Sequence, residues 1–189
     1  NALQGATTGT VTATIDGNLA ELDGLNATGA GSKAAMALTI TVDDAASGAA
    51  GVTALNTIAA ASTATVTSGN VSGTASQLAN LTASGTSATQ AYTITVSDTT
   101  ASVGATIADA TSLANTGVNF ALGITDSFAA VTNGTAVHGN IDKIDAKDAN
   151  VNITVNDAAV ANVSADNVTA INALQGATTG TVTATIDGN

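Results

Sequence analysis

Acidic residues stand where several Thr-rich segments end, and regularly spaced carboxylates can bind a hard cation. The positions are Asp43, Asp44, Asp98, Asp126 and Asp157. If the segments are neighbouring strands, the carboxylates lie only about 5 Å apart and repel one another. Calcium, which prefers oxygen ligands, would relieve that repulsion. The five acids are therefore predicted calcium ligands.

Ordinary turn chemistry explains the same acids without a metal. Asp side chains in turns accept main-chain N–H bonds or cap the next helix. One segment carries Thr67 and Ser68 in place of the acids, so the series is not continuous. Both interpretations stay open at the level of sequence.

Threonines form a second regular pattern. Counted back from the last apolar residue of each Thr-rich segment, they occupy positions one and three in most segments. The members are Thr12, Thr14, Thr39, Thr41, Thr63, Thr65, Thr93, Thr95 and Thr154. Alternation with apolar residues predicts two rows of hydroxyls on an exposed sheet face. Such rows suit exposed strands, but they could also form a lateral interface, and a regular Thr-x-Thr grid resembles ice-binding β-solenoids.

The sequence offers no recognisable catalytic arrangement. His138 is the only histidine and there is no cysteine, so neither a histidine pair nor a thiolate can bind metal or perform acid–base chemistry. No nucleophile triad, Walker loop or dinucleotide fingerprint is present. We therefore expect no enzyme, and we expect His138 to be a loop or cap residue. The charged run from Asp142 to Asp148 is expected to be a solvated face.

The charge balance limits the partners. The net charge is −11, and Lys33, Lys143 and Lys147 are the only cationic residues. Such a surface repels phosphates, so neither nucleic acid nor an anionic membrane is an expected partner. No apolar run reaches the roughly 20 residues of a membrane-spanning helix, so no membrane insertion is expected. The hydrophobic content of 44% suffices for a packed core of small side chains.

Two identical segments indicate how the elements are organised. Residues 172–189, NALQGATTGTVTATIDGN, repeat residues 1–18, which sets a period of 171 residues. Within it, strand-like segments recur every 24 to 31 residues, at 10–16, 37–44, 62–68, 91–98, 120–126, 151–157 and 181–187. Six units of about 28 residues therefore fill one block, as in a tandem repeat protein. We interpret the chain as an excerpt of such an array, with residues 172–189 beginning the next block.

Between these strands, apolar residues recur at every third position. They are Leu19, Leu22, Leu25; Val52, Leu55, Ile58; Leu78, Leu81; Ile107, Ala110, Leu113; Ile141, Ile144; and Val168, Ile171, Leu174. A step of three cannot hold one face of a strand, whereas it forms one stripe of a short helix. Ser47, Ser72, Ser102 and Asp166 precede these segments and are predicted to cap them.

The predicted fold is an α/β solenoid of about 28-residue strand–turn–short helix repeats with a parallel sheet. Helical crossovers between parallel strands are right-handed, and each repeat buries its apolar edge against the next. The alternative is an all-β solenoid, in which tight turns replace the helices. In both cases residues 1–189 are expected to form a single continuous solenoid.

Two segments resemble a known class of protein. They are VSGTASQLANLTASGTSATQAYTITVSDTTASV and VSADNVTAINALQGATTGTVTATIDGN. They resemble degenerate repeats in giant secreted and cell-surface proteins of bacteria, with those of marine cyanobacteria as the nearest comparison. The resemblance implies a surface layer, adhesin or matrix fibre, often with calcium-binding modules elsewhere. The glycine-rich GGxGxD calcium nonapeptide is absent from this sequence.

Together these patterns predict a structural protein that forms an extracellular fibre, stalk or surface layer by stacking tandem solenoid repeats. Its expected location is the cell surface or an extracellular matrix. Its expected partner is itself, end to end or side by side, and no cofactor is expected other than calcium at the acids. The alternative function is an adhesin or ice-binding module that uses the exposed Thr rows.

Overall fold

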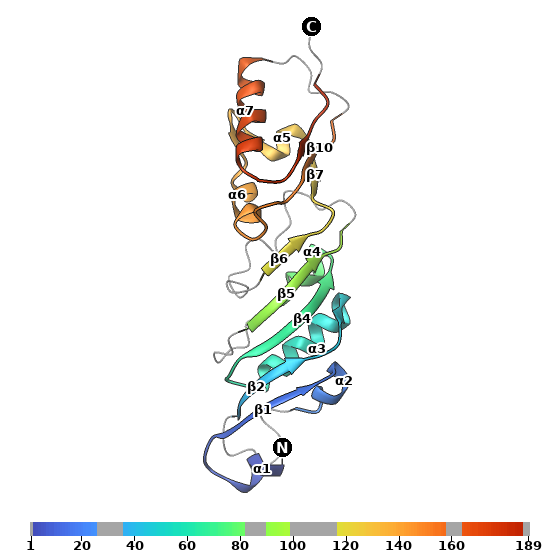
Figure 1. The fold of residues 1–189 in the computed structure, drawn as a ribbon, viewed down its shortest axis with the longest axis vertical. Coiled ribbons are helices and arrows are strands. Elements are labelled where there is room, and N and C mark those ends of the chain that lie inside the picture. Colours follow the sequence, from blue (N-terminus) through green and yellow to red (C-terminus); the bar gives the residue numbers. More distant parts are fainter. Residues whose placement is uncertain (1, 26–35, 82–89, 99–116, 158–163, 187–189) are drawn as a thin grey trace. The chain divides into compact units, whose positions relative to one another are not determined.

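The computed structural model describes residues 2–25, 36–81, 90–98, 117–157 and 164–186. They belong to two compact units, the first drawn mainly from Asn1–Thr95 and the second mainly from Val118–Asn189. We use the word repeat for the stretch that begins at the turn before one strand and ends at the turn before the next strand. Each unit contains parallel strands and short helices (Figure 1).

The first unit is built on a sheet of neighbouring strands. Their order is β1 (Val11–Gly17), β2 (Met36–Val42), β4 (Val66–Gly73) and β5 (Gln90–Val96), with β3 (Ala46–Ser47) beside the end of β4. β2 runs parallel to both β1 and β4, and β3 runs parallel to β4. Parallel neighbours require a crossover connection, and short helices lie in these connections.

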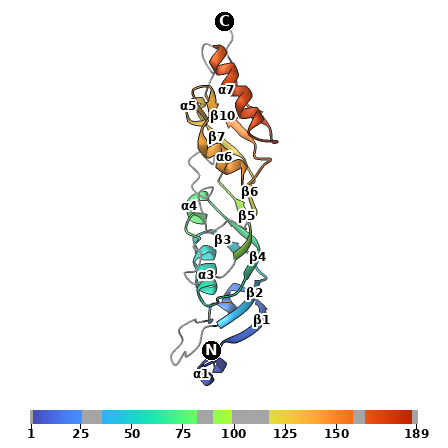
Figure 2. The same ribbon diagram turned by 90° about the vertical axis from the view of Figure 1, so that its left-hand side faces the viewer.

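The helices of the first unit are α1 (Ala2–Ala6), α2 (Leu19–Leu22), α3 (Gly48–Ala60) and α4 (Ala75–Leu78). Figure 2 shows α3 and α4 on one side of the strands. α3 buries Val52, Leu55 and Ile58 at steps of three, while β2 buries every second residue. A Cβ on Gly51 would lie 2.4 Å from the carbonyl carbon of Ala46, so glycine permits the close approach of α3 to β3.

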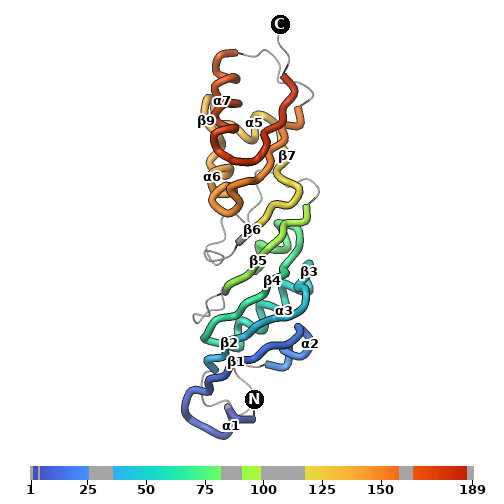
Figure 3. Tube along the Cα trace, in the orientation of Figure 1, coloured from blue at the N-terminus to red at the C-terminus, as the bar shows by residue number. Residues whose placement is uncertain are grey.

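The second unit repeats this construction. β10 (Ile153–Val155) runs parallel to β7 (Ile124–Asp126) on one side and to β11 (Val182–Thr183) on the other. The remaining elements are β6 (Gly117–Phe120), α5 (Phe128–Val131), the antiparallel pair β8 (Thr132–Asn133) and β9 (Ala136–Val137), α6 (Gly139–Asp145) and α7 (Ala165–Gly176). The Cα trace of this unit passes from each parallel strand through helices to the next strand (Figure 3).

These elements confirm the predicted α/β class with mostly parallel strands. The stripes that include Leu19, Val52, Leu78 and Ile141 have residues on helices. Ser47 occupies the N-cap position of α3, but its side chain makes no capping hydrogen bond. The predicted helix around Ile107–Leu113 and its cap Ser102 lie outside the described residues. The single continuous solenoid over residues 1–189 stays a prediction.

Several local predictions are wrong. Thr74 and Ser164, rather than Ser72 and Asp166, are the N-cap residues of α4 and α7. The segment 62–68 becomes a strand only at Val66, because its first residues form a turn. The segment 120–126 is interrupted after β6, where Gly123 has a φ of 72°. Leu122 lies in this turn and is 61% exposed, whereas an unbroken strand over 120–126 would place it among the inward apolar residues.

The strand register differs by two residues from an alignment on the last apolar residue. Ile15 lies beside Ile40 instead of Val42, and Val42 lies beside Ser68. The alignment fails because the residues paired with Val42 are Gly17 of β1 and Ser68 of β4, which are buried but are not apolar letters in the sequence. A shift of two preserves the face of every side chain, so the inward and outward assignments largely survive.

Candidate functional site

Asp44 and Asp157 occupy equivalent positions in the two units. Asp44 follows β2, and its Oδ1 accepts a hydrogen bond of 2.8 Å from the main-chain N–H of Leu19, the first residue of α2. Asp157 follows β10, and its Oδ2 accepts a hydrogen bond from the N–H of Phe128, the first residue of α5. Each carboxylate therefore caps the helix of the preceding repeat, where the helix dipole favours negative charge. These acids therefore accept main-chain N–H bonds, as the turn interpretation predicted, but the helix that they cap precedes their strand instead of following it.

The other three predicted calcium ligands, Asp43, Asp98 and Asp126, do not share one arrangement. Asp126 accepts a hydrogen bond of 2.8 Å from the N–H of Ser127, Asp43 is exposed, and Asp98 is half-buried. Within the described ranges, no group of three or more acidic or histidine side chains could hold a metal ion. The capping carboxylates of Asp44 and Asp157 retain further lone pairs. The assignment of the five acids to calcium stays a prediction.

Asp148 is an acid whose position the sequence does not reveal. It belongs to the charged run that was expected to be solvated, yet only 9% of it is exposed. Its Oδ2 accepts a hydrogen bond of 2.7 Å from the N–H of Phe120, 28 residues earlier. The expectation of a solvated face is therefore wrong at Asp148, because this carboxylate satisfies a buried main-chain donor.

The threonine rows are regrouped by the observed register. Thr12, Thr14, Thr39, Thr41 and Thr93 are exposed, whereas Thr63, Thr65, Thr95 and Thr154 are half-buried. Thr14 lies beside Thr39, and the hydroxyls of Thr41 and Thr67 are 3.4 Å apart. In the second unit Thr154 lies between Thr125 and Thr183. Adjacent threonines therefore exist on neighbouring strands, with partners other than those that the alignment predicted.

A short segment before β4 joins that strand to the preceding repeat through hydroxyl groups. The Oγ of Ser62 accepts a hydrogen bond from Ala64 N–H (3.0 Å) and donates to the carbonyl of Leu38 (2.7 Å). Both the N–H (2.9 Å) and the Oγ1 (3.1 Å) of Thr63 donate to the carbonyl of Met36. Ser62 is buried, so these bonds satisfy main-chain groups that would otherwise lose their contact with water.

The second unit contains the same arrangement before β11. The Oγ1 of Thr178 accepts from Gly180 N–H (2.9 Å) and donates to the carbonyl of Val151 (2.7 Å). The N–H and Oγ1 of Thr179 each donate to the carbonyl of Ala149 at 2.8 Å. These four bonds correspond in the two units, whereas two further bonds differ: Leu38 N–H donates to the Oγ of Ser62 (2.9 Å), and the Oγ1 of Thr178 also donates to the carbonyl of Ala149 (3.2 Å).

We call this element the hydroxyl turn and define it as residues 62–66 (STATV), 178–182 (TTGTV) and 7–11 (TTGTV). A strand bond follows in both paired copies, from Ile40 N–H to Thr65 O and from Ile153 N–H to Thr181 O, each 2.9 Å. The sequence analysis assigned Thr63 and Thr65 to strand rows and gave no role to residues 7–9 and 178–180. The recurring pattern of Ser or Thr, Thr, a small residue, Thr and Val is the signal that could have found it.

His138 confirms the expectation of a cap residue. It is the N-cap of α6, and its Nδ1 accepts a hydrogen bond of 3.2 Å from Asn140 N–H. Its ring is therefore engaged in holding a helix end. The contact gives His138 a structural role.

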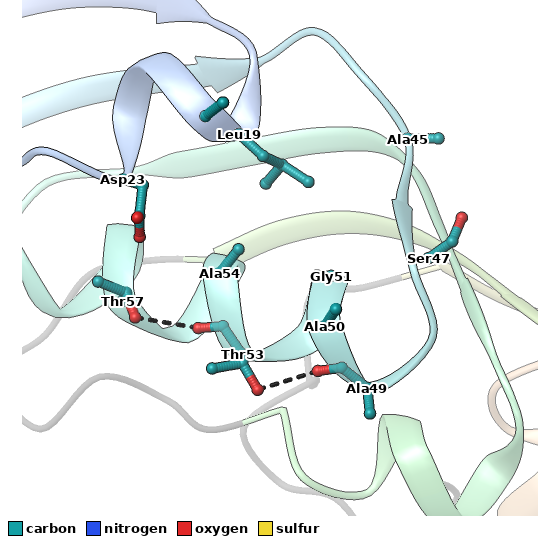
Figure 4. A pocket seen from close by; sticks show the side chains of 11 residues that line it. Leu19, Asp23, Ala45, Ser47, Ala49, Ala50, Gly51, Thr53, Ala54 and Thr57 are labelled. Carbon is teal, nitrogen blue, oxygen red and sulfur yellow. Dashed lines mark hydrogen bonds between the residues drawn. The ribbon is translucent and has the colours of Figure 1, made fainter.

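A shallow groove of about 750 Å³ lies between α2 and α3 (Figure 4). Five alanines line it, together with Leu19 from α2 and Asp23, the C-cap residue of α2. The hydroxyls of Thr53 and Thr57 on this wall donate to the carbonyls of Ala49 (2.9 Å) and Thr53 (3.1 Å) within α3. These hydroxyls are therefore occupied, and the lining does not offer the convergent polar groups with which pockets orient small molecules.

The chain matches no family model, no curated protein and no solved structure. In the described part of the chain, no helix combines the length and apolar character needed to cross a membrane.

Proposed function

We propose that this chain is part of a structural protein of the cell exterior, in which tandem solenoid repeats stack into a fibre, stalk or surface layer. The observation that carries the proposal is the recurrence of the hydroxyl turn. It makes the same bonds to the preceding repeat in both units. An interaction that repeats with the sequence can be extended by adding repeats.

The apolar core supports the same proposal. In the first unit Ile15, Ile40 and Val66 lie side by side on successive strands, and Ile40 and Val66 are fully buried. In such a ladder each repeat covers the apolar edge of its neighbour. Burial contributes about 25 cal/mol per Å² of apolar area, so cohesion grows with the number of repeats.

The proposed partner is another copy of the same repeats, and calcium at the strand-end acids is a proposed accessory. Asp44 and Asp157 already lie between neighbouring repeats, where they bond to the helix of the preceding one. A cation bound at their remaining oxygen atoms would screen the repulsion between successive carboxylates.

Negative-stain electron microscopy tests the proposed function. The sample is a purified protein of two consecutive 171-residue blocks, examined with millimolar calcium and with chelator. Uniform elongated particles or fibres are expected, and their loss in chelator would assign calcium to the acids. Compact globular particles under both conditions would contradict the proposal, because stacked repeats must extend in one direction.

The second candidate is an adhesin or ice-binding module. It is favoured by the paired exposed threonines Thr14 and Thr39, and by the 3.4 Å separation of the Thr41 and Thr67 hydroxyls. Ice shaping by the full chain is the discriminating assay. Rounded, unmodified ice crystals in the presence of the protein would argue against this candidate.

A further inference from the structure

The hairpin of β8 and β9 carries the one Asn–Gly pair of the sequence, Asn133–Gly134. Asn133 pairs with Ala136, and the two residues between them, Gly134 and Thr135, form the turn. Gly134 has a φ of 66°, as the first residue of a tight hairpin turn requires. All four residues are exposed. The structure therefore places this pair in a tight turn that is open to water.

Asparagine is a labile residue, and before a glycine it is open to attack by the chain itself. The main-chain nitrogen of Gly134 would bond to the side-chain carbonyl carbon, Cγ, of Asn133 and close a succinimide ring. The bond from Cγ to the side-chain nitrogen breaks, and ammonia leaves with the proton of the attacking nitrogen. Water then opens the ring at either carbonyl carbon, which yields aspartate or isoaspartate. The reaction needs no oxidant and no reactant other than water.

The structure of the turn favours this attack. Gly134 is the first turn residue, so its N–H lies outside the hydrogen-bond ladder between β8 and β9. A Cβ on Gly134 would meet nothing within 4 Å, so the turn is surrounded by open space. Ring closure also requires rotation of the main chain, which glycine permits more readily than other residues. A ladder of two two-residue strands is held by few hydrogen bonds and opens locally at low cost.

Two other exposed asparagines of the same unit lack these features. They are Asn150 and Asn152, which precede Val151 and Ile153. The N–H groups of Val151 and Ile153 donate to main-chain carbonyls at 3.0 Å and 2.9 Å. Their side chains also branch at Cβ and crowd the nitrogen that would have to attack. Asn150 and Asn152 therefore serve as internal controls.

The hairpin is attached to the buried core of the second unit. Val131 immediately precedes β8 and belongs to the core cluster, and Val137 of β9 packs against that cluster. The N–H of His138 donates to the carbonyl of Val131 at 2.9 Å and joins the two ends of the hairpin. α7 lies against both strands. Isoaspartate would lengthen the main chain at the pair that closes the turn, so the strands could not keep their register beneath α7.

We propose that Asn133 is a site of spontaneous deamidation in the folded protein, and that its conversion to isoaspartate weakens the second unit with time. The reaction does not require the stacking of repeats proposed above. Each conversion also adds a negative charge to a chain that already carries −11. In a tandem array of such blocks the site would recur in every block.

The experiment incubates the full chain in mildly alkaline buffer and follows each asparagine by peptide mass spectrometry. The samples are the wild type, Asn133→Gln, Gly134→Asn, and the wild type unfolded in urea. In the folded wild type, Asn133 is expected to be largely converted while Asn150 and Asn152 remain intact. Asn133→Gln keeps the amide but would have to close a larger ring, so residue 133 should stay unmodified. Gly134→Asn tolerates the positive φ, but its side chain hinders the nitrogen and should slow the conversion.

An intact Asn133 in the folded protein, at a time when the urea-unfolded sample has reacted, would overturn the proposal, because the folded hairpin would then protect it. Conversion of Asn150 or Asn152 at the same rate as Asn133 would also overturn it, since the turn would confer no selectivity. Urea unfolding of the aged samples tests the consequence. The midpoint of the wild type should fall as isoaspartate accumulates, and that of Asn133→Gln should not. An unchanged wild-type midpoint after full conversion would contradict the predicted weakening.

Discussion

At the scale of single residues, the strand-end acids Asp44 and Asp157 accept hydrogen bonds from main-chain N–H groups. Asp44 and Asp157 each accept a hydrogen bond from the first N–H of a short helix in the preceding repeat. Helices of four residues have few internal bonds, so their N-terminal donors depend on such external partners. An acid that follows a strand therefore secures the neighbouring repeat.

Asp44→Ala is expected to lower the free energy of unfolding by about 1 kcal/mol, the usual effect of removing a helix cap. Asp43→Ala is the matched control because Asp43 is adjacent, exposed and equally charged. Urea unfolding followed by circular dichroism measures both variants. Equal destabilisation by the two substitutions would mean that lost charge, rather than the lost bond, causes the effect.

Ser68 shows the opposite situation. It is 2% exposed beside Val42, and its Oγ has no hydrogen-bond partner among the described residues. Ser68→Ala is therefore expected to raise the free energy of unfolding by about 1 kcal/mol, since a desolvated hydroxyl is removed. Ser62→Ala should destabilise the chain instead, because Ser62 bonds to Leu38 and Ala64. In urea unfolding, the midpoint of Ser68→Ala should be higher than that of the wild type and the midpoint of Ser62→Ala should be lower. A shift of both midpoints in the same direction would contradict the prediction.

At the scale of elements, capping boxes define the start of two short helices. In α2 the side chain of Asn18 accepts from Glu21 N–H and that of Glu21 accepts from Asn18 N–H. Thr74 and Gln77 make the same reciprocal pair in α4. This local chemistry explains why segments of only four residues are helical.

Thr74→Ala is expected to destabilise the chain by about 1 kcal/mol through loss of the cap on α4. Ser76→Ala, an exposed position in the same helix, should be neutral or slightly stabilising because alanine favours helices. Thermal unfolding of the two variants makes the comparison. A similar decrease in melting temperature for both would show that the capping box is unimportant.

At the scale of the whole molecule, stability is expected to grow with the number of repeats. Each added block contributes further hydroxyl turns, and each added repeat contributes another interface to its neighbour, so a two-block protein should unfold at a higher urea concentration than one block. The Gly180→Val substitution at the junction is the control, since a Cβ there would lie 2.4 Å from the carbonyl oxygen of Val151 and would disrupt one hydroxyl turn. Identical midpoints for one block, two blocks and the control would mean that neighbouring blocks do not stabilise each other.

The sequence by itself determined the local features of this protein. The three-residue apolar steps specified helices such as α3 and α6, alternation specified β2, and the identical ends revealed the period. These features arise from contacts within a few residues, where side-chain type and spacing are sufficient. The capping role of His138 is also local, since its partner Asn140 is only two residues away.

Only the tertiary structure decided which residues meet across repeats. The bonds from Asp44 to Leu19, from Asp148 to Phe120 and from Thr178 to Val151 span 25, 28 and 27 residues. Their partners depend on the lengths of the turns between strands, and an inward Gly17 or Ser68 conceals the register from an apolar alignment. The contacts of the hydroxyl turn are not evident in the sequence for the same physical reason: its hydroxyls bond to main-chain carbonyls, which every residue possesses.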